Sequence, residues 1–367
     1  MPADRLRAIN ARAIDTRGID GESSPVPDEL SSRHAPRAVV MVRPHHFAPN
    51  PQTRADNAYQ SAPTGTPAQV ARAAYDEVTA MAEALRAAGV TVHLFDDLGT
   101  ATPDSVFPNN WFSTEASGAV AIYPMHCPNR RSERRTDILD ELARRYRVTR
   151  TYDYSAYERD GLYLEGTGSM VLDHRARRAY ACRSRRMSEP LLRRFCEDFA
   201  YEAVVFDAVD DAGVPIYHSN VLMSVGTTTA LVGLEAIPAP DDRRRVRAEL
   251  EATGREVVAL TRAQVADFAG NAFELSTPTG NVLVMSARGV DSLSSEQRAV
   301  IERSTPILPV RIPTIEHAGG SARCMLAGVH LLPRARPETA ATPAMGAASV
   351  TGAPAVDATA GPVTALA

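Results

Sequence analysis

Five polar residues recur along the chain at nearly constant spacing, and this repeat is the strongest constraint on the fold. Asn110, Glu165, His218, Asn271 and Cys324 are separated by 55, 53, 53 and 53 residues. Each lies in a similar pattern: a short apolar strand, a turn, a second strand, a polar helical stretch and a further apolar strand. A unit of this kind cannot bury its own apolar face, so the repeat predicts stacking or radial closure rather than independent domains.

The predicted elements divide into four complete units and one split unit. Strand, turn, strand, helix and strand recur at about 104–154, 161–207, 214–260 and 268–312, with helices predicted over 136–146, 188–199, 240–253 and 294–304. The chain opens with a predicted strand at 38–43, a helix at 67–88 and a strand at 90–95, and it ends in a predicted strand hairpin at 319–332. We expect the two ends to complete a fifth unit that closes the ring and covers its open sheet edges.

One α/β domain over residues 37–332 is the expected organisation. The segment 1–36 is polar with scattered Pro and Gly, and 333–367 is rich in Ala, Thr, Pro and Gly. Neither segment carries enough large apolar side chains to offset the entropy of ordering the chain. We therefore predict a flexible N-terminal segment and a disordered tail on either side of the domain.

Composition excludes several classes of partner. The chain has 367 residues, 44% of them hydrophobic, with a net charge of −4 and a pI near 6.2. This balance gives no reason to expect a nucleic-acid or membrane-surface partner. All 40 basic residues are Arg, and most are interleaved with acids or lie on predicted helix faces, so we interpret the clusters as solvated: 130–135, 144–145, 175–186, 193–194 and 243–245.

The four cysteines point to free thiols in a reducing cytoplasm. They include no Cys-x-x-Cys pair and no His spacing suited to zinc, so neither a disulfide framework nor a metal site is expected. No apolar run reaches the ~20 residues of a membrane span, and the first thirty residues lack the apolar core of a secretory signal. Cys127, Cys182 and Cys196 have no reactive context, and we interpret them as structural.

Cys324 is the candidate nucleophile. It follows a glycine pair, Gly319 and Gly320, which allows the backbone to approach a ligand closely. A cysteine needs a lowered pKa or an adjacent base to react at neutral pH, and His218 is the natural partner. Glu165 could accept a hydrogen bond from the imidazole and favour its charged form. These three residues would supply a nucleophile, a general acid/base and an orienting acid.

Several motifs resemble those of the guanidino-group modifying enzymes. This superfamily contains arginine deiminases, dimethylarginine hydrolases, amidinotransferases and succinylarginine dihydrolase, and the sequence is most similar to its citrulline-utilisation hydrolase, or arginine-deiminase-related, branch. The resemblance spans roughly residues 38–332 and rests on motifs that occur in order: 41–44, 104–111, 164–166, 218–220 and 320–325. It implies a five-bladed α/β propeller, or pentein, with a nucleophilic Cys324, an acid/base His218 and a partner Glu165.

Two asparagines favour a ureido substrate. Arginine-deiminase-like members usually carry Asp at the position of Asn110 and, in many, at that of Asn220, where the carboxylates bind a cationic guanidinium. An amide suits a neutral planar group better, because it offers both a donor and an acceptor to the C=O and NH2 of a urea. Two buried carboxylates without a cation would also be costly. Citrulline hydrolysis to ornithine is therefore the leading prediction.

The remaining predicted substrate contacts are weaker. Asn109, Asn110 and Asn220 are expected to bind the planar head, and Asn271 occupies the fourth position of the repeat. Arg323 and Arg43 are candidates for a substrate carboxylate. The chemistry requires no cofactor, and the sequence leaves open whether the chain forms a homo-oligomer. Alternatives are an arginine or methylarginine deiminase or dihydrolase, an amidinotransferase, and a propeller that only binds a ligand.

Overall fold

The computed structural model describes residues 34–334, whose strands form five three-stranded sheets. In each sheet the inner strand runs antiparallel to the middle strand, and the middle strand runs parallel to the outer one. In inner, middle, outer order the sheets are β15 (Ala327–Val329), β1 (Ala38–Pro44) and β2 (Thr91–Asp97); β3 (Phe112–Thr114), β4 (Ala119–Ile122) and β5 (Arg150–Asp153); β6 (Val171–Asp173), β7 (Arg178–Cys182) and β8 (Glu202–Phe206); β9 (Met223–Val225), β10 (Thr229–Val232) and β11 (Glu256–Ala259); and β12 (Phe273–Thr277), β13 (Gly280–Ser286) and β14 (Ile307–Val310).

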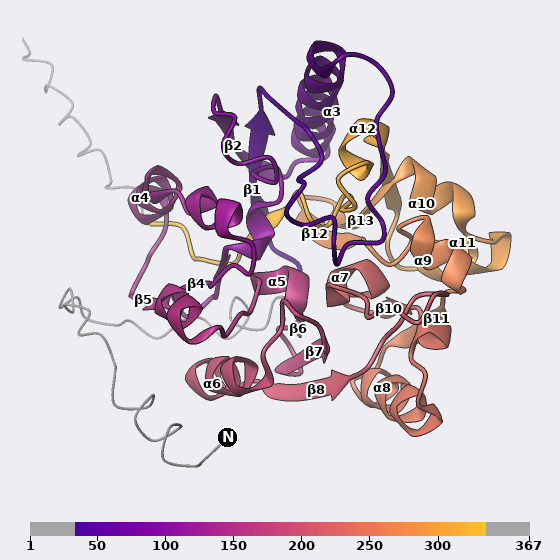
Figure 1. Ribbon diagram of the computed structural model, residues 1–367. Helices are drawn as coiled ribbons and strands as arrows, with labels where there is room; N and C mark the ends of the chain where they lie inside the picture. The colour runs from indigo at the N-terminus through magenta and orange to yellow at the C-terminus, as the bar shows by residue number, and fades with distance from the viewer. Residues whose placement is uncertain (1–33, 335–367) are drawn as a thin grey trace, which may run out of the picture. The chain divides into compact units, whose positions relative to one another are not determined.

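A helical connection joins the middle strand of each sheet to its parallel outer strand, as a parallel crossover requires. Figure 1 shows these helices outside the strands: α3 (Pro67–Ala87), α4 (Thr136–Arg145), α6 (Glu189–Phe199), α8 (Pro240–Ala252), and the pair α10 (Ala287–Ser292) and α11 (Ser295–Glu302). Shorter helical turns lie between these elements: α5 (Gly166–Ser169), α7 (Ser219–Leu222), α9 (Arg262–Ala266), α12 (Pro313–Glu316), η1 (Pro108–Asn110), η2 (Pro128–Glu133), η3 (Ser155–Asp160) and η4 (Leu234–Ala236).

The strand-strand-helix-strand repeat is present, but two local predictions are wrong. The C-terminal hairpin predicted over 319–332 contains a single strand, β15, which pairs antiparallel with β1 from the other end of the chain. The residues before it form turns, with a left-handed Gly319 at φ 78°. The unit predicted over 214–260 does not begin with a strand at its start, since His218 caps the short helix α7 and the first strand, β9, begins only at Met223.

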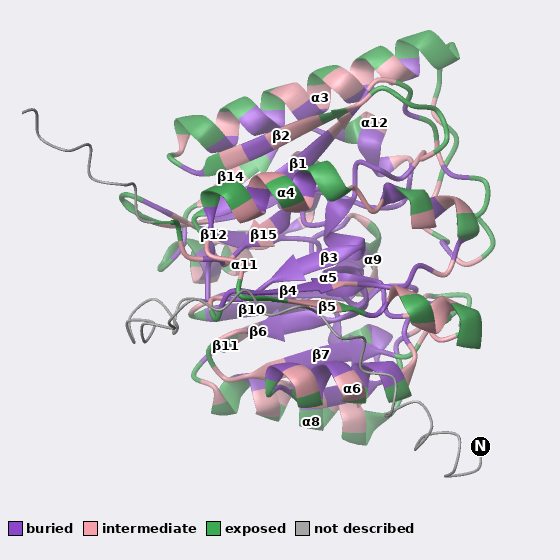
Figure 2. Ribbon diagram, turned by 90° about the vertical axis from the view of Figure 1, so that its left-hand side faces the viewer, coloured by how far each residue is buried: buried purple, intermediate pink, exposed green. Residues whose placement is uncertain are grey.

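The core lies between the sheets and the helices that cover them. Figure 2 shows the inner and middle strands mostly buried and the outer strands partly exposed, while each long helix has one buried and one exposed face. In α3 the buried side chains recur at helical spacing, as in Val70, Ala74, Val78 and Met81. Burial of such faces against the sheet is the main stabilising contribution to the fold.

Contacts between inner strands set the position of neighbouring sheets. β15 contacts β3, β6 contacts β9, and β9 contacts β12, while α5 packs against both η1 and α7. The short helical turns that precede the inner strands are therefore close together in space, although they come from different repeats. Figure 1 shows α5 and α7 near the middle of the sheets.

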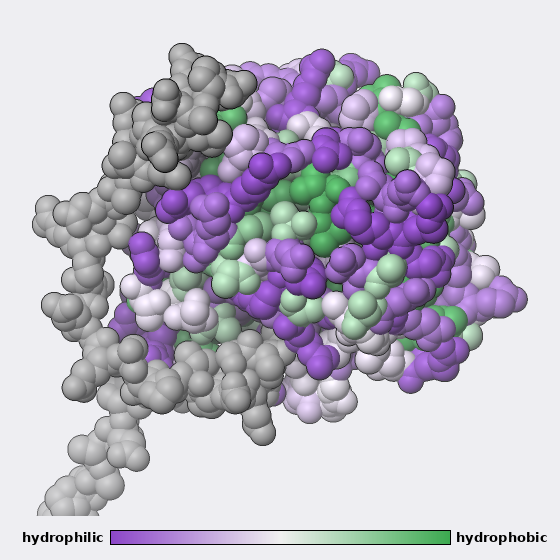
Figure 3. All heavy atoms as spheres, turned by 90° about the horizontal axis from the view of Figure 1, so that it is seen from below, coloured by the Kyte–Doolittle hydropathy of each residue, from purple (hydrophilic) through white to green (hydrophobic). Residues whose placement is uncertain are grey.

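The surface is mainly polar. Seen from below in Figure 3, hydrophilic residues surround a limited hydrophobic area, and the exposed large hydrophobic side chains of the described region are Leu98 and Val214. Within residues 34–334, every helix is too short or too polar to traverse a lipid bilayer. The predicted terminal segments, 1–36 and 333–367, lie almost wholly outside the described residues.

Candidate active site

The repeat residues all sit just before an inner strand. Asn110 ends η1 ahead of β3, Glu165 caps α5 ahead of β6, and His218 caps α7 ahead of β9. Asn271 and Cys324 lie shortly before β12 and β15. All five side chains are buried. The internal repeat therefore places equivalent residues of each unit in one region.

Cys324 lies in a tight turn whose backbone is fixed by Asn271. The amide oxygen Oδ1 of Asn271 accepts hydrogen bonds from the backbone N–H groups of Arg323, at 2.9 Å, and Cys324, at 3.4 Å. The Sγ atom of Cys324 accepts two side-chain N–H groups, from Asn271 Nδ2 at 3.2 Å and Asn220 Nδ2 at 3.4 Å. Two amide N–H groups are therefore directed at the sulfur.

His218 and Glu165 form a buried hydrogen-bonded pair. His218 Nε2 donates to Glu165 Oε2 at 2.9 Å, which leaves Nδ1 as the nitrogen that can accept a proton. Burial lowers the pKa of His218 to about 4, although the hydrogen bond and the charge of Glu165 oppose this shift. The imidazole is therefore neutral at physiological pH and can serve as a base.

Two buried arginines keep Glu165 ionised. Burial alone would raise the pKa of Glu165, but Arg186, the bond from His218, and Arg130 lower it well below its usual range. The guanidinium nitrogens of Arg130 and Arg186 lie 3.4 Å and 3.5 Å from Oε2, and the backbone N–H of His126 donates to Oε1 at 3.0 Å. The carboxylate is thus held in place by several donors besides the imidazole.

Two further carboxyl groups complete this charged cluster. Arg130 binds Glu133 through Nε and an NH2 nitrogen, at 3.0 and 2.9 Å, and it lies 3.5 Å from Asp104. Burial raises the pKa of Glu133 to about 8 and also raises the pKa of Asp104, against the opposing charge of Arg130. The Oδ1 atom of Asp104 has no hydrogen-bond partner among the described residues.

Cys324 and His218 line one small cavity. Asp104, Arg130 and Arg186 line it as well. Its volume of about 10 Å³ is roughly the space of a single water molecule. Segment 45–66 helps to close it, since Asn57 lines the cavity and Asp56 forms an ion pair with Arg186 at 2.6 Å. A substrate of amino-acid size therefore requires this segment or its neighbours to move.

The sequence profile of the family described as N,N dimethylarginine dimethylhydrolase, eukaryotic, matches residues 43–331. The chain belongs to this family. It is therefore a member of the pentein superfamily of guanidino-group modifying enzymes, and a cysteine-dependent hydrolase of C–N bonds. This confirms the superfamily expected from the motifs. A search of curated protein sequences finds no match to the chain.

Solved structures with the same fold include two proteins named ArgZ and AgrE. The N-terminal domain of ArgZ, an arginine dihydrolase from the ornithine-ammonia cycle in cyanobacteria, was solved bound to substrate; it is 16% identical, with a TM-score of 0.59, over 80% of this chain and 97% of that one. Unliganded AgrE is 17% identical with a TM-score of 0.61, over 81% of this chain and 40% of that one. These identities are low, so the likeness establishes a shared fold.

A third structure is a dimethylarginine dimethylaminohydrolase in an adduct with S-methyl-L-thiocitrulline. It is 15% identical with a TM-score of 0.53, and the match covers 82% of this chain and all of that one. This chain therefore shares its α/β architecture with ArgZ, AgrE and the dimethylarginine dimethylaminohydrolase.

The structure brings most of the predicted substrate residues close to Cys324. Asn220 and Asn271 contact its sulfur, and the Oδ1 atom of Asn220 is buried without a hydrogen-bond partner within residues 34–334. Asn110 donates to Asn109 Oδ1 and accepts a bond from Arg130 at 3.0 Å. Asn109 in turn donates to the backbone oxygen of Arg323 at 3.0 Å.

The two arginines predicted to bind a substrate carboxylate, Arg43 and Arg323, do not line the cavity that contains Cys324. Arg43 is on β1, where it donates to both oxygens of Asp96, at 2.8 and 3.2 Å, and to Thr79. Arg323 lies in the turn next to Cys324, but it directs a guanidinium nitrogen to the Leu326 backbone oxygen at 2.7 Å and stacks over Phe273. Neither lines the cavity of Cys324, so the geometry gives no support to that role.

Arg130 and Arg186 are the site residues that the sequence interpretation missed. We predicted the clusters 130–135 and 175–186 to be solvated, and this is wrong for these two side chains, which are only 2% and 1% exposed. Two acids in the sequence could have indicated these buried arginines: Asp104, which lies inside a recognised motif, and Glu133, three residues after Arg130. Buried acids require cationic partners.

The other three cysteines are unsuited to nucleophilic chemistry. All four cysteines are buried and free. Burial raises the pKa of Cys127 and Cys182 to about 11 and that of Cys196 to about 12, so these groups stay protonated thiols. Among residues 34–334 no group of three or more His, Cys, Asp or Glu side chains is arranged to hold a metal ion.

Proposed function

We propose that this enzyme hydrolyses a C–N bond at the planar carbon of a ureido or guanidino amino acid, with Cys324 as nucleophile. The observation that carries the proposal is the surroundings of the sulfur. Sγ accepts N–H groups from Asn220 and Asn271, and it shares its cavity with the His218 that Glu165 holds. These are the parts that covalent catalysis by a thiol needs: a stabilised thiolate, a base and a group that orients the base.

The proposed reaction begins with proton transfer from the Cys324 thiol to Nδ1 of neutral His218. The thiolate attacks the planar carbon and forms a C–S bond, which gives a tetrahedral adduct. The C–N bond breaks as His218 returns its proton to the departing nitrogen. Water then attacks the covalent intermediate and transfers a proton to His218, the C–S bond breaks, and the thiol is regenerated.

A ureido head group, as in citrulline, fits the atoms next to the sulfur. The side-chain groups that reach Sγ are two N–H donors, from Asn220 and Asn271. Donors stabilise the carbonyl oxygen of a urea and the oxyanion that develops in the adduct. A guanidinium carries only N–H donors. It would place these donors against the amide N–H groups of Asn220 and Asn271, which is unfavourable. The Oδ1 atom of Asn220, which has no hydrogen-bond partner in the part of the chain that the structure describes, would accept from the urea NH2.

A guanidino substrate, arginine or a methylated arginine, is the second candidate. Asp104 lines the same cavity, and its Oδ1 lacks a partner in the described region. Such an oxygen would accept a hydrogen bond from a guanidinium or from the ammonium of an amino acid. Arg130 and Arg186 lie on the same cavity and could attract a substrate carboxylate.

An ammonia-release assay across citrulline, arginine, methylated arginines and agmatine, with product masses, tests the proposal. Cys324→Ser should abolish turnover, because the hydroxyl is a far weaker nucleophile at neutral pH, while thermal unfolding stays close to wild type. Cys196→Ser, which replaces a structural thiol, is the matched control and should retain activity. Undiminished turnover in the Cys324 variant would exclude the nucleophile. Adding glycine or ornithine as an acceptor distinguishes hydrolysis from amidino transfer.

We also propose that the five sheets close into one ring and that the domain spans about residues 37–332, in a cytoplasmic protein. The contacts of β15 with β3, of β6 with β9 and of β9 with β12 support ring closure. Free thiols at all four cysteines suit a reducing compartment. A crystal structure with an open gap between two neighbouring sheets would contradict the closed ring.

A further inference from the structure

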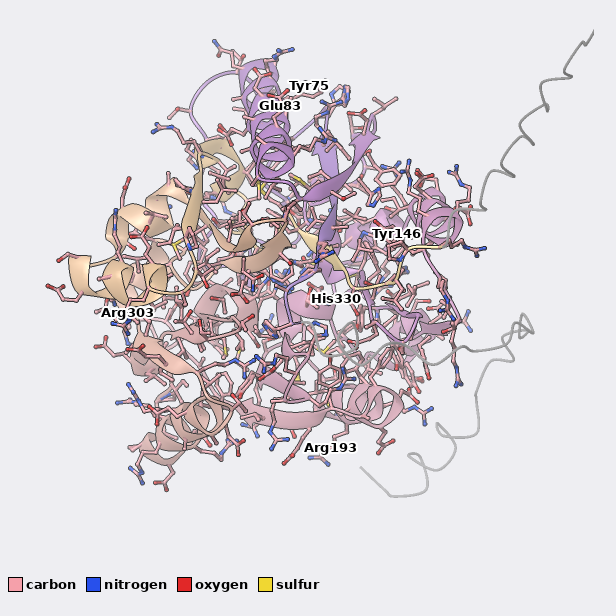
Figure 4. The ribbon with its side chains drawn as sticks, turned by 180° about the vertical axis from the view of Figure 1, so that it is seen from behind. Tyr75, Glu83, Tyr146, Arg193, Arg303 and His330 are labelled. Atoms are coloured by element: carbon pink, nitrogen blue, oxygen red, sulfur yellow. The ribbon has the colours of Figure 1, made fainter. Side chains whose placement is uncertain are left out.

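A second cavity lies among the inner strands and shares no lining residue with the cavity of Cys324. All five sheets contribute to it, through residues such as Thr114 of β3, Val171 of β6, Val225 of β9, Phe273 of β12 and Gly328 of β15. Its volume is about 30 Å³, roughly the space of two water molecules. Figure 4 shows the structure from behind, with His330, one of the lining residues, near the centre of the sheets.

Arg323 brings an uncompensated positive charge to this cavity. The side chain is 9% exposed and lines the cavity. Its contacts are the Leu326 backbone oxygen and the Phe273 ring, and no carboxylate of residues 34–334 pairs with it. Burial lowers the pKa of Arg323 to about 10, so the guanidinium remains charged at neutral pH. A buried cation without a partner is costly unless an anion or water compensates it.

The acids near the cavity already have partners other than Arg323. Glu115 accepts a hydrogen bond from Arg177 at 3.0 Å, and Asp173 pairs with Arg255 at 2.6 Å. Glu274 accepts bonds from the backbone and hydroxyl of Thr227 and does not line the cavity. These carboxylates therefore leave the charge of Arg323 unmatched.

Two more polar atoms in the cavity wall lack a hydrogen-bond partner among the described residues, although one of them, His34 Nδ1, lies 3.7 Å from Asp173 Oδ1. Ser224 Oγ and His34 Nδ1 are buried and make no hydrogen bond within the described structure. His34 Nε2 lies 2.6 Å from the Val225 backbone oxygen and must donate to it, so Nδ1 of the neutral ring is an acceptor. The wall thus offers charged donors from Arg323, a hydroxyl from Ser224 and an acceptor from His34.

We propose that this cavity binds a small monoanion, paired with Arg323 and hydrogen-bonded to Ser224. An oxyanion that carries a hydroxyl, of the size of hydrogencarbonate, would satisfy all three groups, because its O–H could donate to His34 Nδ1. A halide would satisfy Arg323 and Ser224 only. The cavity is too small for a nucleotide or an amino acid. The inference does not depend on which substrate reacts at Cys324.

Thermal unfolding of the full chain tests the site. In a buffer of large organic anions, added hydrogencarbonate or bromide should raise the midpoint by roughly 3–6 °C at about one hundred times the Kd. Arg323→Gln should remove this response, and Ser224→Ala should weaken it. Arg43→Gln, which removes a guanidinium from an ion pair elsewhere, is the matched control and should respond like wild type.

Crystallography of the unaltered protein makes the test independent of any variant's folding. Anomalous scattering from a bromide soak should show a peak in the cavity beside Arg323, and a hydrogencarbonate soak should show planar density there. A stronger response to hydrogencarbonate than to bromide would support the oxyanion, and the reverse would support a halide. Density in neither soak, or an unchanged thermal response in Arg323→Gln, would overturn the proposal.

Discussion

At the scale of single residues, the proposed reaction depends on the charge of the His218–Glu165 pair. Burial favours the neutral imidazole, and Glu165 opposes this effect. The proposed cycle needs both forms in turn, because His218 first accepts the thiol proton and then donates it to the leaving nitrogen. Glu165 stabilises the second form, the imidazolium, at a distance of 2.9 Å.

Glu165→Gln should therefore lower kcat by about 10²- to 10⁴-fold, the usual size of an acid/base contribution. Without the carboxylate charge the imidazolium is less stable, so the pH at which His218 becomes protonated should fall further. The measurement is kcat for ammonia release as a function of pH. Glu274→Gln alters another buried acid, one bound to Thr227 and Thr305, and should keep near-normal kcat. Equal losses in both variants would contradict a specific role for Glu165.

Gly168 keeps the space beside His218 free of a side chain. A Cβ at this position would lie 2.8 Å from His218 Nδ1 and closer still to Asn110 Nδ2. Gly168→Ala should therefore displace the imidazole or the amide and reduce kcat at least about tenfold, since small misplacements of catalytic groups are costly. Gly99→Ala is the control, because its Cβ would meet only the flexible Asp97 side chain at 3.3 Å. The check is kcat of both variants, measured on samples with the same folded fraction.

At the scale of elements, the sequence predicted the long helices well and the short ones poorly. The strongest signal marks α3, where apolar residues recur at helical spacing, and the structure adds a capping box of Thr66 and Gln69 at the start of this helix. By contrast, α5 and α7 have four residues each, too few for a periodic pattern. Their geometry comes from tertiary contacts, such as α5 against η1 and α7, and these contacts position Glu165 and His218.

Thr66→Ala should destabilise the protein by about 1 kcal/mol, because the hydroxyl accepts the Gln69 backbone N–H and the first turn of α3 would lose this partner. Chemical denaturation measures the change in the free energy of unfolding. Thr64→Ala, two residues earlier in the same connection and exposed, should change it by less than about 0.5 kcal/mol. A similar loss in both variants would argue against the cap.

At the scale of the whole molecule, the 53-residue repeat predicted the five-sheet architecture, because each unit supplies one sheet. It also brought Cys324, His218 and Glu165 into one region. The repeat could not predict Arg130, Arg186 or Asp104, which lie outside the equivalent positions. Their burial depends on segment 45–66, where Asn50 binds Asp104 and Asp56 binds Arg186. Such contacts between distant segments leave no periodic signal in the sequence.

The stability of the whole molecule should depend on pH through its buried imidazoles. The pKa of His218 is lowered from 6.5 to about 4 by burial, so the unfolded chain binds this proton first as the pH falls. The contribution of the neutral ring is complete above about pH 6.5 and is lost progressively toward pH 4. Between pH 6.5 and pH 5, a span of 1.5 units, protonation of His218 should lower the free energy of unfolding by about 2 kcal/mol.

His218→Gln isolates this effect from the other buried groups. Glu133, whose pKa burial raises to about 8, changes stability in the opposite direction over the same range, but it is common to both proteins. We therefore expect the free energy of unfolding of wild type, minus that of His218→Gln, to fall by about 2 kcal/mol between pH 6.5 and 5. The exposed His46→Gln should follow wild type. A difference independent of pH would mean that His218 is charged in the folded protein, and the base role assigned to it would then fail.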